Sequence, residues 1–311
     1  MNRTRILNVA TIVLLIAGVC MLFYPAINNI IFVYKQNQVI SDYNTQIVNL
    51  DEQDVRVMEE EAQKYNDSLA SAYVEQSADD QSEQSVSLNL SYSQLLNVSD
   101  EQMGYIVIPK ISLNQPVYHG TDDAVLERGI GHMENTSLPV GGANTHSVLT
   151  GHTGVPGMML FTDLEKMEVG DKFYIKTLNK ILAYEVDSIR VVLPNVTEYF
   201  KVIPDKDLVT LVTCTPYGVN SHRLLVRGTR VEYNGEIDDL NKPNIEETTQ
   251  KSEEKPQSTA DEALTSTKYN KFSKQFILYY VVIPAIVSVI LIFVLVKVLK
   301  KRKKKSNKST E

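Results

Sequence analysis

A cysteine and an arginine nine positions apart have the clearest chemical potential in this sequence. Cys214 ends the run Leu208-Val-Thr-Leu-Val-Thr-Cys214, and Arg223 begins the run Arg223-Leu-Leu-Val-Arg. Both runs are aliphatic and β-branched, and the segment between them contains proline and glycine, so the pattern predicts two strands joined by a loop. A thiol and a guanidinium can then face each other across that loop. Strand alternation puts Val212 on the same face as Cys214, and Leu211 and Thr213 on the opposite face.

A cysteine nucleophile reacts as its thiolate and needs a partner that moves protons. His152 lies between Gly151 and Thr153, directly after a predicted strand, where a turn can bring the ring to a cleft. It can protonate a leaving amine and later take a proton from an incoming nucleophile. Arg223 stays protonated, so it can only donate hydrogen bonds to a carbonyl or oxyanion. We expect the remaining histidines to be structural: His119, His132, His146 and His222.

The residues alone leave a second interpretation open, in which Cys214 is a buried, unreactive cysteine among structural histidines. The other cysteine, Cys20, lies in an apolar N-terminal segment, so no disulfide is expected in the middle of the chain. No His/Cys cluster has the spacing of metal ligands and no glycine-rich phosphate loop is present, so we expect no metal and no cofactor. Arg227 and Arg230 are expected to form surface ion pairs, and Asp122 and Asp187 to be solvated carboxylates.

Two segments without charge are long enough to cross a bilayer core of about 30 Å. They cover residues 6–33 and 276–296. The first could be a cleaved signal peptide, but Tyr24-Pro25 and the absence of a small-x-small exit site favour an uncleaved anchor. Basic residues precede the first span and follow the second, which predicts that residues 1–5 and 297–311 lie in the cytoplasm.

Residues 34–275 are therefore expected outside the membrane. This part has 21 basic and 37 acidic residues, and its negative charge disfavours nucleic acid as a partner. Apolar residues at three- and four-residue steps predict amphipathic helices over 39–75, followed by a mobile segment to residue 91. Residues 34–100 thus form a helical and mobile N-terminal segment, and residues 234–275 have the composition of a disordered acidic stalk.

Residues 101–233 have the pattern of a β domain. Seven or eight short strands predict an all-β fold, closed or sandwiched. Strands are predicted at 105–108, 115–118, 147–150, 173–177, 181–192, 208–214 and 223–233, and short helices at 122–128, with Thr121 as its N-cap, and at 158–167.

Several motifs in this domain resemble one family. Thr210-Leu-Val-Thr-Cys214 is similar to the Thr-Leu-x-Thr-Cys signature of sortases, the cysteine transpeptidases of Gram-positive cell surfaces. The stretches 105–111, 116–120, 131–142, 149–154 and 214–228 are similar, in the same order, to the pilin-polymerising class C. The resemblance covers about residues 60–232. It implies an eight-stranded β-barrel with Cys214 as nucleophile, His152 as proton donor and acceptor, and Arg223 as the group that orients substrate and stabilises the oxyanion.

The same resemblance implies a reaction and partners. A Leu-Pro-x-Thr-Gly-like signal is cleaved between Thr and Gly, a thioester forms on the cysteine, and a lysine of another pilin subunit resolves it, so that pili polymerise at the Gram-positive cell membrane. Three alternatives remain: a sortase that anchors proteins to peptidoglycan, a hydrolytic cysteine protease, and a non-catalytic membrane-anchored adhesin or scaffold. The sequence departs from class C in one respect. Residues 76–100 have no Asp-Pro-aromatic motif of the kind that forms a lid over the cysteine. Either the lid is absent or it is built from other residues such as Tyr92, and our hypothesis is that no such motif autoinhibits the enzyme.

Overall fold

The computed structural model describes residues 3–78, 91–99, 101–235 and 237. The compact unit that begins at Phe32 contains the β domain and the helices in front of it. The earlier part of the first helix belongs to a second unit and is considered by itself. The expected stalk, except for its first few residues, and the expected second membrane span at 276–296 lie outside the described residues.

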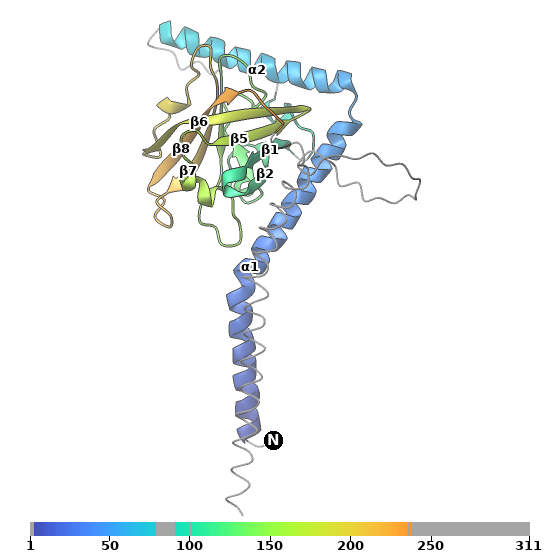
Figure 1. Cartoon of the computed structure of the whole chain (residues 1–311), viewed down its shortest axis with the longest axis vertical. Helices are drawn as coiled ribbons and strands as arrows, with labels where there is room; N and C mark the ends of the chain where they lie inside the picture. The colour runs from blue at the N-terminus through green and yellow to red at the C-terminus, as the bar shows by residue number, and fades with distance from the viewer. Residues whose placement is uncertain (1–2, 79–90, 100, 236, 238–311) are drawn as a thin grey trace, which may run out of the picture. The chain divides into compact units, whose positions relative to one another are not determined.

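Eight strands form a closed barrel in the order β1-β2-β3-β4-β7-β8-β6-β5 (Figure 1). Most neighbours are antiparallel, but β2 pairs with β3 and β4 pairs with β7 in parallel. The strands are β1 Gln102–Ile108, β2 Leu113–His119, β3 Ile130–His132, β4 Thr145–Thr150, β5 Lys172–Thr177, β6 Lys180–Val192, β7 Asp207–Thr215 and β8 His222–Val231. The prediction of seven or eight strands is therefore confirmed, and of the closed and sandwiched arrangements that the pattern left open, the fold is the closed one.

Two local predictions were wrong in detail. The helix expected at 158–167 is a 3-10 helix, η3 Phe161–Lys166. The helix expected at 122–128 is the shorter α3 Asp123–Leu126, and its N-cap is Asp122 rather than Thr121, because the Asp122 side chain accepts a hydrogen bond from the Val125 N–H. Strand β3 had not been predicted, since three residues that include a glycine give no periodic signal. The other short helices are η1 Tyr92–Gln94, η2 Pro109–Ile111 and η4 Glu198–Phe200.

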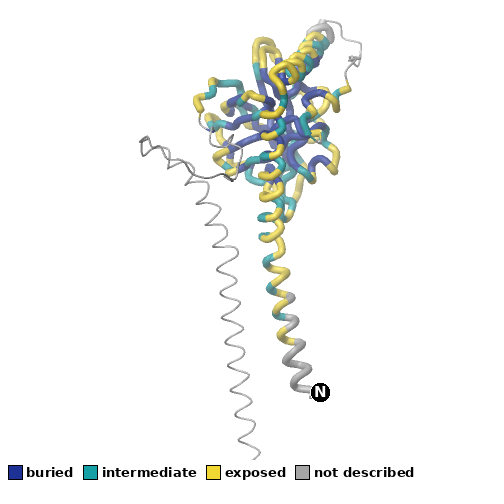
Figure 2. The backbone as a smooth tube through the Cα atoms, turned by 90° about the vertical axis from the view of Figure 1, so that its right-hand side faces the viewer, coloured by how far each residue is buried: buried dark blue, intermediate teal, exposed yellow. Residues whose placement is uncertain are grey.

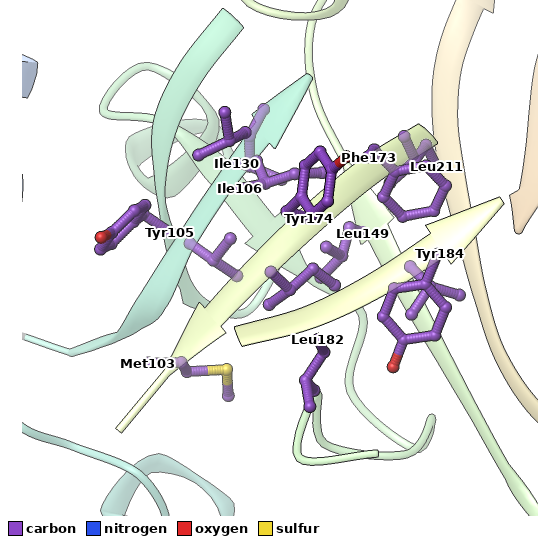
Figure 3. Close-up of a cluster of buried hydrophobic side chains, with 14 of the residues drawn as sticks. Met103, Tyr105, Ile106, Ile130, Leu149, Phe173, Tyr174, Leu182, Tyr184 and Leu211 are labelled. Atoms are coloured by element: carbon purple, nitrogen blue, oxygen red, sulfur yellow. The ribbon is translucent and has the colours of Figure 1, made fainter. Parts of the chain in front are cut away.

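The main core fills the barrel. Figure 2 shows the buried segments gathered in the middle of the barrel domain, and Figure 3 shows a cluster of buried side chains from β1, β3, β4, β5, β6 and β7. The rings of Phe173 and Tyr184 stack with centroids 5.5 Å apart. A Cβ at Gly228 would lie 2.6 Å from the Phe173 ring, so this position in β8 requires glycine. Close packing of this kind makes the barrel a rigid support for residues on its outer face.

The N-terminal helices extend the core beyond the barrel. They are α1 Arg3–Asn49 and α2 Glu52–Ala78, and α2 runs along one end of the barrel (Figure 1). The predicted apolar stripe is confirmed, since most of its members are buried: Ile40, Tyr43, Ile47, Val55, Ala62, Tyr65 and Leu69. Polar groups fix the position. The Tyr43 hydroxyl donates to the Met103 carbonyl and accepts from the Leu178 N–H, at 3.0 and 2.9 Å.

One helix among the described residues is long and apolar enough to cross a membrane, by length and composition. It is the stretch Gly18–Asn49 of α1. The predicted span at residues 6–33 overlaps its first half.

Candidate active site

Cys214 and Arg223 lie directly opposite each other on β7 and β8. Both residues are partly exposed. Side chains opposite each other in an antiparallel pair share a face, with Cβ atoms about 4.5–5.5 Å apart. The hydrogen bonds from the Val219 and Asn220 N–H groups to the Pro216 carbonyl, at 3.0 and 2.9 Å, close the loop between the strands. The predicted juxtaposition of thiol and guanidinium across one loop is therefore confirmed at the level of strand register.

His152 reaches the same level of the sheet from the neighbouring strand. Parallel pairing aligns Thr150 of β4 with Val212 of β7. The Gly151 N–H continues this ladder by donating to the Val212 carbonyl at 3.1 Å. His152 and Cys214 each lie two residues further along the chain than this aligned pair. Cys214 is on β7 and Arg223 on the adjacent β8, and His152 is in the turn that follows β4.

Hydrogen bonds fix the backbone around His152. The Thr213 hydroxyl, which is buried, donates to the Gly151 carbonyl at 2.7 Å. The Phe161 N–H of η3 donates to the His152 carbonyl at 2.9 Å. Because Thr213 points to the opposite face from Cys214, this bond ties β7 to the turn that carries His152 without occupying the face of the thiol.

The Arg223 guanidinium is held by its own loop. Its Nη1 donates to the carbonyls of Asn220 and His222 at 3.3 and 3.1 Å. A guanidinium has five N–H donors in a planar fork. Two contacts through one nitrogen orient the group and leave donor capacity for a substrate carbonyl on the face of Cys214.

A small apolar cluster, separate from the main core, lies on the same face of the sheet as Cys214. We call it the outer cluster. Its buried members are Val148, Val212 and Leu225, and Met133, Val192, Tyr199 and Phe200 pack against them. Leu211 belongs to the main core instead, which confirms the predicted alternation of β7. Sequence reasoning missed this cluster, because Tyr199 and Phe200 lie in the connection between β6 and β7 and their contacts are made only in the fold.

Of the other histidines, His119, His132 and His146 are buried and hydrogen-bonded, whereas His222 is partly exposed and contacts its neighbour in the chain. His119 contacts the carbonyls of Leu95 and Glu101, His132 contacts Tyr92 and Ser137, His146 contacts Thr210 and Lys201, and His222 contacts Ser221.

Several charged residues outside the site are paired. Arg227 pairs with Asp187 at 2.9 Å and Arg230 with Asp207 at 3.4 Å, so the prediction of ion pairs for both arginines is confirmed. Asp122 and Asp187 are both exposed, as predicted, and each also has a structural contact: Asp122 caps α3, and Asp187 accepts from the Thr229 hydroxyl. Within the described part of the chain, no group of three or more His, Cys, Asp or Glu side chains is placed to bind a metal ion.

Strand register puts Cys214 and Arg223 on one face, and the turn that carries His152 lies beside the strand of Cys214. A thiol, an imidazole and a guanidinium are the groups that cysteine-dependent acyl transfer uses. A model of the sortase domain matches residues 106–231. The chain is 42% identical in sequence to Streptococcus agalactiae sortase C1, whose crystal structure was solved in complex with MTSET. The two structures align with a TM-score of 0.55, and the match covers 62% of this chain and 97% of the sortase C1 chain. Sortase C-1 from Streptococcus pneumoniae is 44% identical, with a TM-score of 0.56 over 63% of this chain and all of that one. The chain belongs to the sortase family, whose members are cysteine transpeptidases.

Curated relatives match over a shorter range. Sortase A of Streptococcus agalactiae serotype III (strain NEM316) is 34% identical over 116 residues, which are 36% of this chain and 47% of that protein. Sortase A of Staphylococcus aureus (strain NCTC 8325 / PS 47) is 33% identical over 138 residues, 42% of this chain and 65% of that protein. The match thus spans between about half and two thirds of these relatives, whereas the solved sortase C structures are matched along nearly their whole length.

Proposed function

We propose that this protein is a membrane-anchored class C sortase that joins pilin subunits. The observation that carries the proposal is the register that aligns Cys214 with Arg223, with His152 brought alongside by the parallel pairing of β4 and β7. The extended similarity to solved sortase C structures supports class C among the sortases.

In the first half-reaction, the Cys214 thiolate attacks the Thr carbonyl of a Leu-Pro-x-Thr-Gly-like signal. An S–C bond forms, and N–H groups of Arg223 stabilise the negative charge that develops on the oxygen. The Thr–Gly C–N bond then breaks as protonated His152 gives its proton to the leaving glycine amine. The products are a thioester on Cys214 and a free peptide with an N-terminal glycine.

In the second half-reaction, a lysine amine of another pilin attacks the thioester. The new N–C bond is an isopeptide bond, His152 takes the proton from the attacking nitrogen, and the S–C bond breaks to restore the Cys214 thiolate. A lysine acceptor gives a covalent polymer, a peptidoglycan amine gives an anchored surface protein, and water gives hydrolysis. The acceptor alone distinguishes these outcomes.

The anchoring part of the proposal rests on the two apolar spans and the basic residues outside them. The apolar stretch within α1 is compatible with the first span, at residues 6–33. The second span, at 276–296, and the orientation with residues 34–275 outside are proposals from composition.

The experiment uses the full chain in detergent micelles, as wild type and as Cys214→Ala, with peptides of the Leu-Pro-x-Thr-Gly type and intact-mass spectrometry. A peptide thioester is expected on the wild type only, and a pilin domain with an accessible lysine should discharge it to an isopeptide-linked product. Release by water alone, with no amine product, would favour the protease. An adduct that persists in Cys214→Ala would exclude Cys214 as the nucleophile.

A further inference from the structure

The connection between β6 and β7, residues 193–206, covers the outer cluster beside the proposed catalytic residues. Its 3-10 helix η4 presents Tyr199 and Phe200, which pack against Val148, Val212 and Leu225. The guanidinium of Arg190, on β6, lies 5.0 Å from the centre of the Tyr199 ring, a distance that gives a cation–π attraction. The position of this connection therefore decides how much of the apolar surface next to Cys214 is covered.

One buried side chain ties the middle of this connection to the barrel. His146 of β4 is 1% exposed. Its Nδ1 lies 2.8 Å from the Lys201 carbonyl, directly after η4, and its Nε2 lies 2.8 Å from the Thr210 hydroxyl of β7. The ring thus bridges β4, β7 and the connection.

The chemistry of the two partners fixes the protonation of the ring. A carbonyl can only accept, so Nδ1 carries the hydrogen, and Nε2 is left to accept from the Thr210 hydroxyl. Burial lowers the pKa of His146, and the positive charge of Arg227 lowers it further, although the Lys201 carbonyl and Asp187 act in the opposite direction. His146 is therefore neutral at physiological pH, in the one tautomer that satisfies both contacts.

The other hydrogen bonds of the connection do not provide this tie. The Val196 N–H donates to the Leu193 carbonyl and the Phe200 N–H to the Thr197 carbonyl, so these two bonds join residues of the connection to one another. At its far end, the Asp205 N–H donates to the Asn144 side chain and the Thr145 N–H to the Lys206 carbonyl. These contacts fix where the connection enters β7, and the bond to His146 fixes the part that carries Tyr199 and Phe200.

A donor peptide that runs along β7 from Cys214 towards Thr210 would meet this region. A strand advances about 3.3 Å per residue. An extended peptide with its scissile carbonyl at Cys214, running along β7 towards Thr210, would place the residues two to four positions before the cleaved bond about 7 to 13 Å away. That distance corresponds to Val212 and Thr210, which lie beneath the connection.

We propose that His146 is a positioning residue, whose bond to the Lys201 carbonyl holds Tyr199 and Phe200 in place and so sets the apolar surface that the donor peptide contacts. This inference rests on the proposed function, because it assigns the residue to donor recognition. His146 does not touch the reacting atoms, and its effect is on the binding of the donor rather than on bond making.

Two substitutions separate the two bonds of the ring. In His146→Asn the amide nitrogen occupies a position close to that of Nδ1, so the donor to Lys201 is kept. In His146→Gln the longer side chain reaches the position of Nε2, so the contact with Thr210 is kept and the bond to Lys201 is lost. The full chain in detergent would be assayed for kcat and KM of donor-peptide cleavage, and for hydrogen exchange at residues 199–201.

His146→Gln is expected to raise the donor KM by about 3- to 10-fold, the range that one hydrogen bond supports, with kcat changed less than about 2-fold. Exchange at 199–201 should become faster. His146→Asn should match the wild type in both readouts. Equal effects of the two substitutions, no effect of either, or an effect on kcat alone would overturn the proposal.

Two provisions keep the test decisive. If His146→Gln does not fold, His146→Leu replaces it, since leucine removes both bonds of the ring, and Thr210→Val is its control, since valine removes only the contact with Thr210. KM and exchange are then expected to rise in His146→Leu and to stay unchanged in Thr210→Val, and unchanged values in His146→Leu would refute the proposal. If the wild type cleaves no donor peptide, the proposed function fails, whereas the exchange measurement still shows whether His146 holds the connection.

Discussion

At the scale of single residues, the alternation of side chains along β7 puts the proposed nucleophile on one face and the residue that supports the His152 turn on the other. Cys214 faces the site with Arg223 opposite it, while Thr213 faces the other way and bonds to the Gly151 carbonyl. The turn that carries His152 is therefore held by the residue just before the nucleophile. A small shift of a proton-transfer group has large kinetic consequences, because proton transfer depends on alignment within hydrogen-bond distance.

Replacement of Thr213 tests this support. In Thr213→Val the shape is kept and the buried Gly151 carbonyl loses a donor, which is expected to lower the free energy of unfolding by about 1–2 kcal/mol. Displacement of the His152 turn is expected to slow thioester formation about 10-fold or more. Thr213→Ser keeps the hydroxyl and is the control for both measurements, by denaturant unfolding and by rapid-quench mass spectrometry. Equal acylation rates for the valine and serine variants would contradict the role given to this bond.

His132 makes stability depend on pH. It is completely buried, its Nδ1 contacts the Tyr92 hydroxyl and its Nε2 the Ser137 carbonyl, and burial lowers its pKa to about 4. Between this value and the ordinary pKa of about 6.5 the unfolded chain binds more protons, so stability falls as pH falls through this window. From this group alone, the free energy of unfolding should be about 2 kcal/mol lower at pH 5 than at pH 8.

Denaturant unfolding of His132→Gln and of the wild type at pH 8 and pH 5 measures this contribution. The variant should lose less stability on acidification, by about 2 kcal/mol. His222→Gln is the matched control, since His222 lies at the start of β8 and is partly exposed, and it should follow the wild type. If the free energy of unfolding of His132→Gln fell with pH as much as that of the wild type, His132 would not be the group that makes stability depend on pH.

At the scale of elements, the N-terminal helices are part of the folded domain. The Asn66 side chain of α2 forms two hydrogen bonds with the backbone of Leu138, which lies between β3 and β4. The Leu138 N–H donates to Oδ1 at 2.7 Å, and Nδ2 donates to the Leu138 carbonyl at 3.1 Å. Asn66 is 1% exposed, so water cannot replace these bonds without opening the interface.

Asn66→Ala is therefore expected to lower the free energy of unfolding by about 2–3 kcal/mol, because it leaves the N–H and the carbonyl of Leu138 unpaired. Amide exchange at Leu138 should rise by a larger factor than exchange at the strands of the barrel. Lys64→Ala, at an exposed position on the same helix, should change stability by less than about 0.5 kcal/mol. If the two variants were equally stable, the helix would not be docked through Asn66.

At the scale of the whole molecule, both sides of the segment 79–90 are attached to the barrel. α2 is docked on one side. On the other, the Tyr92 hydroxyl contacts Nδ1 and the carbonyl of His132 and accepts from the Gly120 N–H, at 2.8, 3.0 and 3.1 Å. The contacts named for the two attachments are made by residues outside this segment, which itself lies beyond the described part of the chain.

We therefore expect that a Gly-Ser linker of equal length can replace residues 79–90 without loss of the fold. Because this region has no Asp-Pro-aromatic motif, labelling of Cys214 by a small thiol reagent should change by less than about 2-fold. Thermal unfolding of the same sample checks that the domain is intact. A large rise in labelling of the intact domain would mean that the segment covers the thiol, and the lidless interpretation would be wrong.

Local sequence patterns are sufficient to predict the local elements and the pair across the loop. Alternation in 208–214, the apolar stripe of 39–75 and the Pro-Gly loop after Cys214 are properties of neighbouring residues, and each needs only one element or one hairpin to form. For this reason the strands, the N-terminal helices and the register of Cys214 with Arg223 could be predicted. The choice of His152 among five histidines rested on a turn and on a family resemblance.

Which distant segments meet follows from the folded barrel and not from any local pattern. Parallel pairing of β4 with β7 brings residues about 60 positions apart into register, and no local pattern specifies such a partner, since it follows from closing the barrel around its core. The short β3, the outer cluster beneath Tyr199 and Phe200, and the bridge through His146 have the same origin. Their residues have ordinary local surroundings in the sequence, and burial among partners from several strands gives them their roles.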